Sequence, residues 1–241
     1  MSIRCIILAA GRGSRLGSLT NKKPKCLIQL NGKSLLEHQL AILRASNIKD
    51  IGIVTGYKRQ LLSDFGLYEF HNNKWDKTNM VSSLECADSW LNKYHCIVSY
   101  GDIFYQHRAI KKLILSKDEM AITYDPNWKL LWEKRFDNPL DDAETFKLNA
   151  DSTISEIGKV PTDLNQIQGQ YMGLLKFTPA SWKEVKSIRS KMSNTMKSKM
   201  DMTTLLQKII LKNKIKVKGL IYEDNWGEID TESDLNVYKN T

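Results

Sequence analysis

IRCIILAAGRGSRLGSLTNKKPK, residues 3 to 25, decides the fold of this chain, because an apolar run leads directly into a glycine-rich basic loop. The run from Ile3 to Leu8 is typical of a parallel strand that is buried on both faces. Glycines without side chains then let backbone N–H groups converge on an anion. The loop contains Gly11, Gly13 and Gly17 together with Arg12, Arg15, Lys22, Lys23 and Lys25. The stretch predicts a buried strand followed by a phosphate-binding loop.

Two common phosphate-binding motifs do not fit this loop. A dinucleotide fingerprint that starts at Gly11 requires a glycine at position 16, where Leu16 stands. A Walker A loop that ends in the G-K-S of residues 32–34 requires a glycine at position 27, where Leu27 stands. The loop therefore belongs to another type.

The motif L-A-A-G-x-G-S-R-L followed by K-P-K resembles the nucleotidyltransferases of the sugar-nucleotide pyrophosphorylase type. Members of that family join a nucleoside triphosphate to a phosphorylated small molecule and release pyrophosphate. The resemblance implies that Arg15 and Lys25 neutralise the phosphates. It also implies that the base and triphosphate are surrounded by Leu8, Ala9, Ala10, Gly11 and Gly13. The alternative is a glycine-rich turn with a solvated basic face.

Composition points to a single α/β domain. The 241 residues contain no linker rich in Pro, Gly or Ser, no evident repeat and no apolar run near the roughly 20 residues of a membrane span. No signal peptide is evident, so we expect a soluble cytoplasmic protein without membrane insertion. The four cysteines form no C-x-x-C pair and the four histidines form no H-E-x-x-H motif, so neither a disulfide framework nor a structural zinc site is expected.

The formal charge of +9 is concentrated in one segment. Between Lys183 and Lys218, eleven Lys or Arg residues face only Glu184 and Asp201, which leaves the rest of the chain neutral. These cations alternate with apolar residues on predicted helices, which is typical of a solvated face. A membrane surface or nucleic acid is the alternative partner, but no recognition module accompanies the charge, so no nucleic-acid partner is expected.

Alternating apolar runs and helical patterns predict a Rossmann-like, doubly wound, mostly parallel sheet flanked by helices. We expect a nucleotide-binding part over residues 1–125, an inserted β-rich substrate-binding part over 126–180, and C-terminal helices with a last strand over 181–241. Strands are expected at Cys26–Leu30, Ile51–Thr55, Cys96–Tyr100, Met120–Tyr124, Leu130–Lys134, Thr145–Leu148, Ile154–Ile157, Gln170–Phe177 and Ile215–Ile221. Helices are expected at Leu35–Ala45, Met80–Leu91, Ala109–Leu115, Ser181–Ser190 and Met202–Leu211.

Two aspartates end predicted strands far apart in the sequence. Asp102 follows C-I-V-S-Y-G, and Asp230 ends W-G-E-I-D. Either one alone could be a turn former or a helix cap. The resemblance implies that the two match the family's metal-binding aspartates, with Asp102 also at the nucleotide, so that they hold Mg²⁺ against the α-phosphate.

The resemblance also indicates where the substrates bind. T-N-M-V-S-S-L resembles the family's base-reading stretch, in which Asn79 and Ser83 would face a pyrimidine edge, although Asn79 could equally be an ordinary helix N-cap. Lys159 matches a lysine that binds the incoming phosphate. Tyr171, Trp132 and Trp226 are candidate substrate-pocket aromatics, and each could instead be core.

The implied reaction is attack by a phosphate oxygen of the acceptor on the α-phosphorus. A phosphate monoester has a second pKa of about 6, so it needs no general base at neutral pH. Within the family the chain looks most like the cytidylyltransferases of the phosphocholine type, which favours CTP. The overall resemblance favours glutamine phosphate as the acceptor, in capsule modification.

The acceptor pocket itself leaves alternatives open. Trp128, Trp132, Tyr171, Asp141 and Asp142 could form a cage for phosphocholine. Lys129, Lys134 and Arg135 would suit an acceptor with a carboxylate. A sugar 1-phosphate with UTP or dTTP is a further option, and a noncatalytic nucleotide-binding or nucleic-acid-binding protein is the alternative from another class. Oligomeric state is not readable from the sequence.

Overall fold

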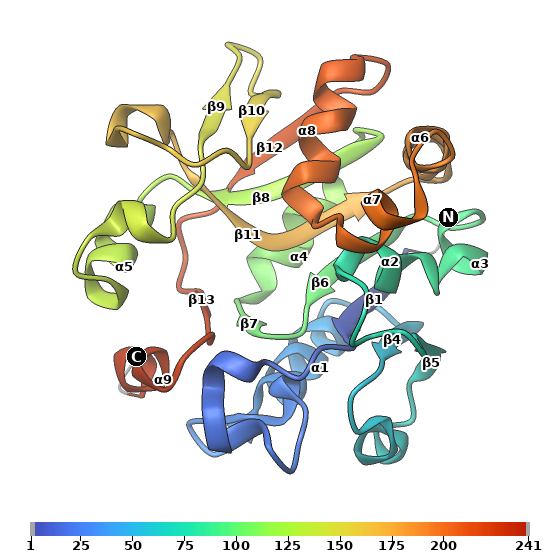
Figure 1. Ribbon diagram of the computed structural model, residues 1–241, viewed down its shortest axis with the longest axis vertical. Coiled ribbons are helices and arrows are strands. Elements are labelled where there is room, and N and C mark those ends of the chain that lie inside the picture. The colour runs from blue at the N-terminus through green and yellow to red at the C-terminus, as the bar shows by residue number, and fades with distance from the viewer. Residues whose placement is uncertain (1–2, 240–241) are drawn as a thin grey trace.

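A computed structural model describes residues 3–239 of the chain. Its centre is a seven-stranded sheet in the order β12-β8-β11-β6-β1-β4-β5, with helices over both faces (Figure 1). The strands are β1 (Arg4–Ala9), β2 (Gln29–Leu30), β3 (Lys33–Ser34), β4 (Ile51–Thr55), β5 (Tyr68–His71), β6 (Cys96–Tyr100), β7 (Ile103–Phe104), β8 (Met120–Asp125), β9 (Phe146–Leu148), β10 (Ile154–Ile157), β11 (Gln170–Phe177), β12 (Val217–Ile221) and β13 (Gly227–Glu228).

The helices lie between most of these strands. The α-helices are α1 (Leu35–Ala45), α2 (Met80–Glu85), α3 (Asp88–Leu91), α4 (His107–Leu115), α5 (Trp128–Arg135), α6 (Pro179–Arg189), α7 (Asn194–Lys199), α8 (Met202–Lys212) and α9 (Glu232–Tyr238). The 3₁₀ helices are η1 (Ser14–Thr20), η2 (Lys25–Leu27), η3 (Arg59–Phe65), η4 (Pro139–Asp141) and η5 (Leu164–Gln166). None of the described helices is long and apolar enough to cross a bilayer.

The sheet is parallel except at β11. β1 pairs in parallel with β4 and β6, while β11 runs antiparallel between β6 and β8. Because β1 and β6 are parallel neighbours, their carboxyl ends open onto the same edge of the sheet. A hydrogen bond from Gly101 N to Leu8 O, 2.9 Å long, holds the carboxyl ends of β1 and β6 together there.

The sequence around β1 and α1 folds as its pattern predicts. Cys5, Ile6 and Ile7 are fully buried, as a strand covered on both faces requires. Ser34 caps α1 by accepting a hydrogen bond from Glu37 N, and the Glu37 carboxylate accepts one from Ser34 N, so the helix begins with a capping box. The fold class expected from the sequence is confirmed.

Two expected strands are wrong. Instead of a strand at Cys26–Leu30, the chain forms η2 and the two-residue strand β2, because Asn31 and Gly32 both take positive φ and close a tight hairpin with β3. Leu130–Lys134 lies in helix α5 rather than in a strand. Trp128 and Trp132, four residues apart, are both buried on one face of that helix, while Leu130 between them is exposed.

Smaller differences concern element bounds. The helix expected at Met80–Leu91 is interrupted after Glu85 and continues as α3, and β5 at the sheet edge was not expected. Most cations of the segment from Lys183 to Lys218 lie on α6, α7, α8 and β12, while Lys191, Lys214 and Lys216 lie in the connections between these elements. The division of the chain into three functional parts stays a prediction.

Candidate active site

Three neighbouring hollows open where β1 and β6 end. One of about 200 Å³ is lined by Leu8, Ala10, Gly11, Trp75, Thr78, Asn79, Met80, Ser83, Tyr100, Gly101 and Asp102. A second of about 150 Å³ shares Leu8, Gly11, Gly101 and Asp102 with it and adds Ala9, Gly13, Lys25 and Cys26. A third of about 230 Å³ is lined by Arg15, Met80, Tyr100, Trp132, Asp142, Glu144, Gln170, Tyr171, Met172, Gly173, Asp201, Met202, Thr203, Glu228 and Asp230. We name them for the roles that the sequence analysis predicts, as the base, phosphate and acceptor hollows.

Glycines shape the phosphate hollow. Gly13 has φ of 74°, and a Cβ atom there would lie 2.8 Å from the Lys25 side chain, so only glycine lets Lys25 pass beneath the loop. A Cβ atom on Gly101 would lie 2.6 Å from the backbone oxygen of Leu8. Of the loop glycines predicted from the sequence, Gly13 is therefore required by its conformation and by Lys25, whereas a Cβ atom on Gly11 would meet no atom within 4 Å.

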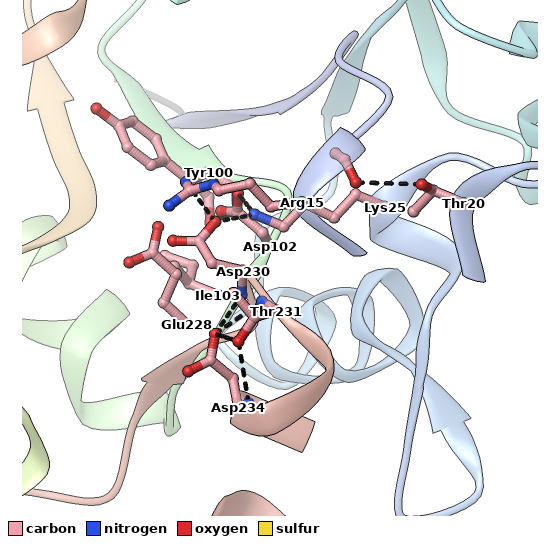
Figure 2. A network of polar contacts seen from close by, with 12 residues as sticks. Arg15, Thr20, Lys25, Tyr100, Asp102, Ile103, Glu228, Asp230, Thr231 and Asp234 are labelled. Atoms are coloured by element: carbon pink, nitrogen blue, oxygen red, sulfur yellow. Dashed lines mark hydrogen bonds and ion pairs between the residues drawn. The ribbon is translucent and has the colours of Figure 1, made fainter. Parts of the chain in front are cut away.

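Cations and carboxylates from opposite ends of the chain meet beside this hollow (Figure 2). Lys25 Nζ lies 2.6 Å from Asp102 Oδ2 and 2.5 Å from Asp230 Oδ1, and Arg15 lies 2.9 Å from the same Asp230 oxygen. Burial lowers the pKa of Lys25, but the charges of Asp102 and Asp230 outweigh this effect and raise the pKa above its ordinary value. Four of the site residues predicted from the sequence are therefore in direct contact.

Three carboxylates in this cluster could hold a divalent cation. Asp102, Glu228 and Asp230 each offer an oxygen, and these oxygens lie within 4.8 Å of one another. Asp102 Oδ1 is buried and makes no hydrogen bond to any described residue, so this oxygen is available as a metal ligand. A buried, unpartnered oxygen among carboxylates fits a hard cation.

Glu228 was missed by the sequence analysis. It precedes Asp230 by two residues in W-G-E-I-D, and residues i and i+2 of an extended segment point to the same side. Burial, together with the charges of Asp230 and Asp102, raises the pKa of Glu228 to about 8. The i, i+2 spacing was the signal that could have found it.

The predicted base-reading residues both line the base hollow. Asn79 caps α2 with its side-chain oxygen, which accepts from Met80 N at 2.7 Å, and its amide nitrogen donates to Lys199 O at 3.2 Å. Ser83 is buried, and its hydroxyl accepts from Asn72 at 3.0 Å. The N-cap and the pocket position thus coexist, while base recognition by these residues stays a prediction.

The predicted acceptor residues are only partly brought together. Trp132 and Tyr171 line the acceptor hollow. Trp226 lies behind them, with its ring centroid 6.2 Å from that of Trp132, and donates to Asp125. Lys159 lines none of the three hollows and pairs with Glu156 at the surface, so its phosphate-binding role stays a prediction without support from the geometry.

The acceptor hollow is acidic. Asp142, Glu144 and Asp201 line it, and Thr203 donates to Glu144 at 3.1 Å. Burial raises the pKa of Asp142 and raises that of Glu144 to about 6. The suggestion that Arg135 contacts the acceptor is wrong, because its side chain is fully buried and pairs with Asp234.

Comparisons with known proteins identify the family of the chain. Residues 5–140 match the MobA-like NTP transferase domain. The chain belongs to that family. The transferase is also 38% identical to the CTP:phosphoglutamine cytidylyltransferase of Campylobacter jejuni, over 98% of either protein. It is 36% identical to the choline-phosphate cytidylyltransferase of Streptococcus pneumoniae over 38% of this chain and 42% of that protein. The nucleotidyltransferase resemblance of the first loop is confirmed.

Solved structures share the fold of the transferase. The inositol-1-phosphate CTP transferase from T. maritima superposes with a TM-score of 0.78 at 22% identity, over 99% of this chain and 94% of that one. The CTP:phosphocholine cytidylyltransferase from Streptococcus pneumoniae superposes with a TM-score of 0.73 at 21% identity, over 99% and 98%.

Proposed function

We propose that the transferase moves CMP from CTP to glutamine phosphate and releases pyrophosphate, with Mg²⁺ at Asp102, Glu228 and Asp230. The observation that carries this proposal is that the base hollow shares lining residues with each of the other two, and that the paired cations and carboxylates line the phosphate and acceptor hollows. The full-length relative that acts on phosphoglutamine supports the choice of both substrates.

The nucleotide would enter along the first loop. The base hollow offers the Asn79 and Ser83 side chains at its wall, and the phosphate hollow next to it has Lys25 on one side and loop backbone on the other. A triphosphate that extends from one hollow to the other brings its α-phosphate close to Asp102, which lines both.

The acceptor hollow suits a substrate that carries both a cation and a phosphate. Asp142, Glu144 and Asp201 can pair with an ammonium group, and Arg15 can receive the phosphate beside Asp230. Phosphocholine is the second candidate, since the rings of Tyr100, Trp132 and Tyr171 also line the hollow and suit a quaternary ammonium group.

The chemistry reduces to alignment and charge neutralisation. An oxygen of the dianionic acceptor phosphate forms a bond to the α-phosphorus, and the bond between that phosphorus and pyrophosphate breaks. Lys25 and Arg15 lower the repulsion between the two anions and stabilise the charge that develops on the leaving group. A bound divalent cation would screen the same phosphates.

We place the reaction in the cytoplasm. Cys5, Cys26 and Cys96 are buried and unpaired, which suits a reducing compartment. A role in capsule modification stays a prediction.

Pyrophosphate release from CTP, UTP, dTTP and ATP, each with glutamine phosphate, phosphocholine or glucose 1-phosphate, tests the proposal. We expect turnover with CTP and glutamine phosphate well above every other pair. Preference for phosphocholine would support the second candidate, and release with none of the pairs would overturn both.

Two variants test the assigned residues. Asp102→Asn and Lys25→Ala should each reduce turnover by about 10²-fold or more, as loss of one group that stabilises the transition state does. Arg108→Ala is the matched control, because Arg108 is exposed and pairs only with Asp224 in the structure. Near-normal release in both site variants would remove this mechanism.

A further inference from the structure

One charged side chain of the site region is fully buried and is not explained by substrate binding. Arg135 ends helix α5, and its guanidinium group is completely shielded from solvent. Burial lowers the pKa of Arg135, but the hydrogen bond to Asp234 and the charge of Glu228 outweigh this effect, so the group stays charged. A buried charge needs partners that hold it in place.

Those partners are Asp234 and two carboxylates of the candidate metal cluster, Glu228 and Asp230. Arg135 Nε donates to Asp234 Oδ1 at 2.9 Å, and a terminal nitrogen lies 3.7 Å from Asp230 Oδ2. The other terminal nitrogen is buried without a hydrogen bond among the described residues, and it lies 3.7 Å from Glu228. Arg135 therefore faces the cluster from the side opposite Lys25.

Asp234 links Arg135 to the backbone of Asp230. Its Oδ2 atom accepts from Asp230 N and from Thr231 N, each at 2.8 Å, and caps helix α9 (Figure 2). Helices α5 and α9 pack together on one side of the molecule (Figure 1). Arg135 thus holds the side chain of Asp230 directly and its backbone through Asp234.

The two oxygens of Asp230 consequently have different partners. Oδ1 contacts Lys25 and Arg15 on the nucleotide side, and Oδ2 faces Arg135. We propose that Arg135 is a positioning residue that fixes Asp230 so that Oδ1 is the oxygen presented to the nucleotide and its cation. When Lys25 and Arg15 bind phosphates, Arg135 remains as the cation that balances the charges of Glu228 and Asp230.

Arg135 also connects the two substrate regions. Trp132, three residues earlier on α5, lines the acceptor hollow, and the guanidinium carbon of Arg135 lies 5.0 Å from the centre of its ring. A shift of α5 at the acceptor hollow would therefore reach Asp230. The inference rests on the proposed metal role of Asp230.

The test removes the guanidinium together with the charge of Asp234, the carboxylate to which it donates. The double variant is Arg135→Met with Asp234→Asn. The asparagine keeps an oxygen that can accept from Asp230 N and Thr231 N, while the methionine no longer contacts the side chain of Asp230. Mn²⁺ binding to the nucleotide-free protein is followed by EPR in a Lys25→Met background, where the competing ammonium group is absent. Arg108→Met in the same background is the control.

We expect the Arg135→Met/Asp234→Asn pair to weaken Mn²⁺ binding about 10- to 100-fold, the usual effect of losing a group that orients a metal ligand. Thermal unfolding should stay close to that of the background, and Arg135→Lys should recover part of the affinity. In the protein with Lys25 intact, kcat should fall while the KM for CTP stays largely unchanged.

The outcomes separate the two claims. Equal Mn²⁺ affinity with and without Arg135 would overturn its positioning role and leave the proposed function untouched. Absence of Mn²⁺ binding in the Lys25→Met background itself would overturn the metal site, and with it both the inference and that part of the proposed function.

Discussion

Lys25 occupies the position between Asp102 and Asp230 that a metal ion would need, so replacing it should tighten metal binding in the absence of nucleotide. Its ammonium group makes contacts of 2.6 and 2.5 Å with the two carboxylates. A hydrogen bond to a charged group contributes about 1.5–3 kcal/mol, so a cation that displaces Lys25 forgoes about 3–6 kcal/mol. At about 1.4 kcal/mol per tenfold change, this corresponds to about 10²- to 10⁴-fold in affinity.

The expected gain lies near the lower end of that range, because Arg15 still contacts Asp230 at 2.9 Å after the substitution. Calorimetric titration of Mn²⁺ into nucleotide-free Lys25→Met should therefore show binding about 10²-fold tighter than in the unaltered protein. The same variant should lose turnover, since Lys25 is also the proposed partner of the phosphates. Affinity and activity then move in opposite directions.

Lys22→Met is the matched control, because Lys22 belongs to the same loop and is exposed. It changes the net charge equally but leaves the carboxylates paired with Lys25. Affinity in Lys25→Met that is equal to or weaker than that of the unaltered protein would refute the idea that the ammonium group competes with the cation.

Three further predictions follow from the site. Gly101→Ala should lower the free energy of unfolding by about 1–3 kcal/mol in urea titrations and reduce turnover, because its Cβ atom would lie 2.6 Å from Leu8 O; an unchanged transition would contradict this packing. The pKa of Glu144, about 6, predicts that the KM for an ammonium-bearing acceptor falls as pH rises through 6, since the carboxyl is neutral below that value and charged above it; Glu144→Gln should make the profile shallower, leaving the contribution of the acceptor phosphate, and a profile identical to that of the unaltered protein would exclude Glu144. Replacing Lys208, Lys214 and Lys216 with Gln should leave pyrophosphate release intact, and its loss would favour a functional basic surface.

The sequence predicted the sheet well where one local pattern determines an element. The bounds of β4, β6, β11 and α1 agree with the expected ones, because each combines a continuous apolar run or a helical period with a clear start or stop signal. The prediction for the residues of helix α5 was wrong because their local pattern is ambiguous. Its adjacent apolar residues from Leu130 to Trp132 looked extended, while the spacing that matters is between Trp128 and Trp132.

The site was predictable as far as motifs extend. Gly13 and Lys25 belong to a loop whose composition predicts phosphate binding, the family resemblance singled out Asp102 and Asp230, and the structure brings all four together. Arg135 has no such motif, because its partners lie 93 to 99 positions later in the chain. Only tertiary packing shows that its charge is buried against carboxylates rather than offered to a substrate.

The contact between Lys25 and Asp230, 205 positions apart, also affects how the protein acquires activity during synthesis. A ribosome-bound nascent chain that has emerged as far as β6 already carries the first loop and Asp102, so it could retain a nucleotide but not complete the carboxylate pair. On the proposed role of Asp230, catalytic competence would arrive only when residue 230 has left the exit tunnel and docked. Unfinished polypeptides would consequently not consume nucleoside triphosphate.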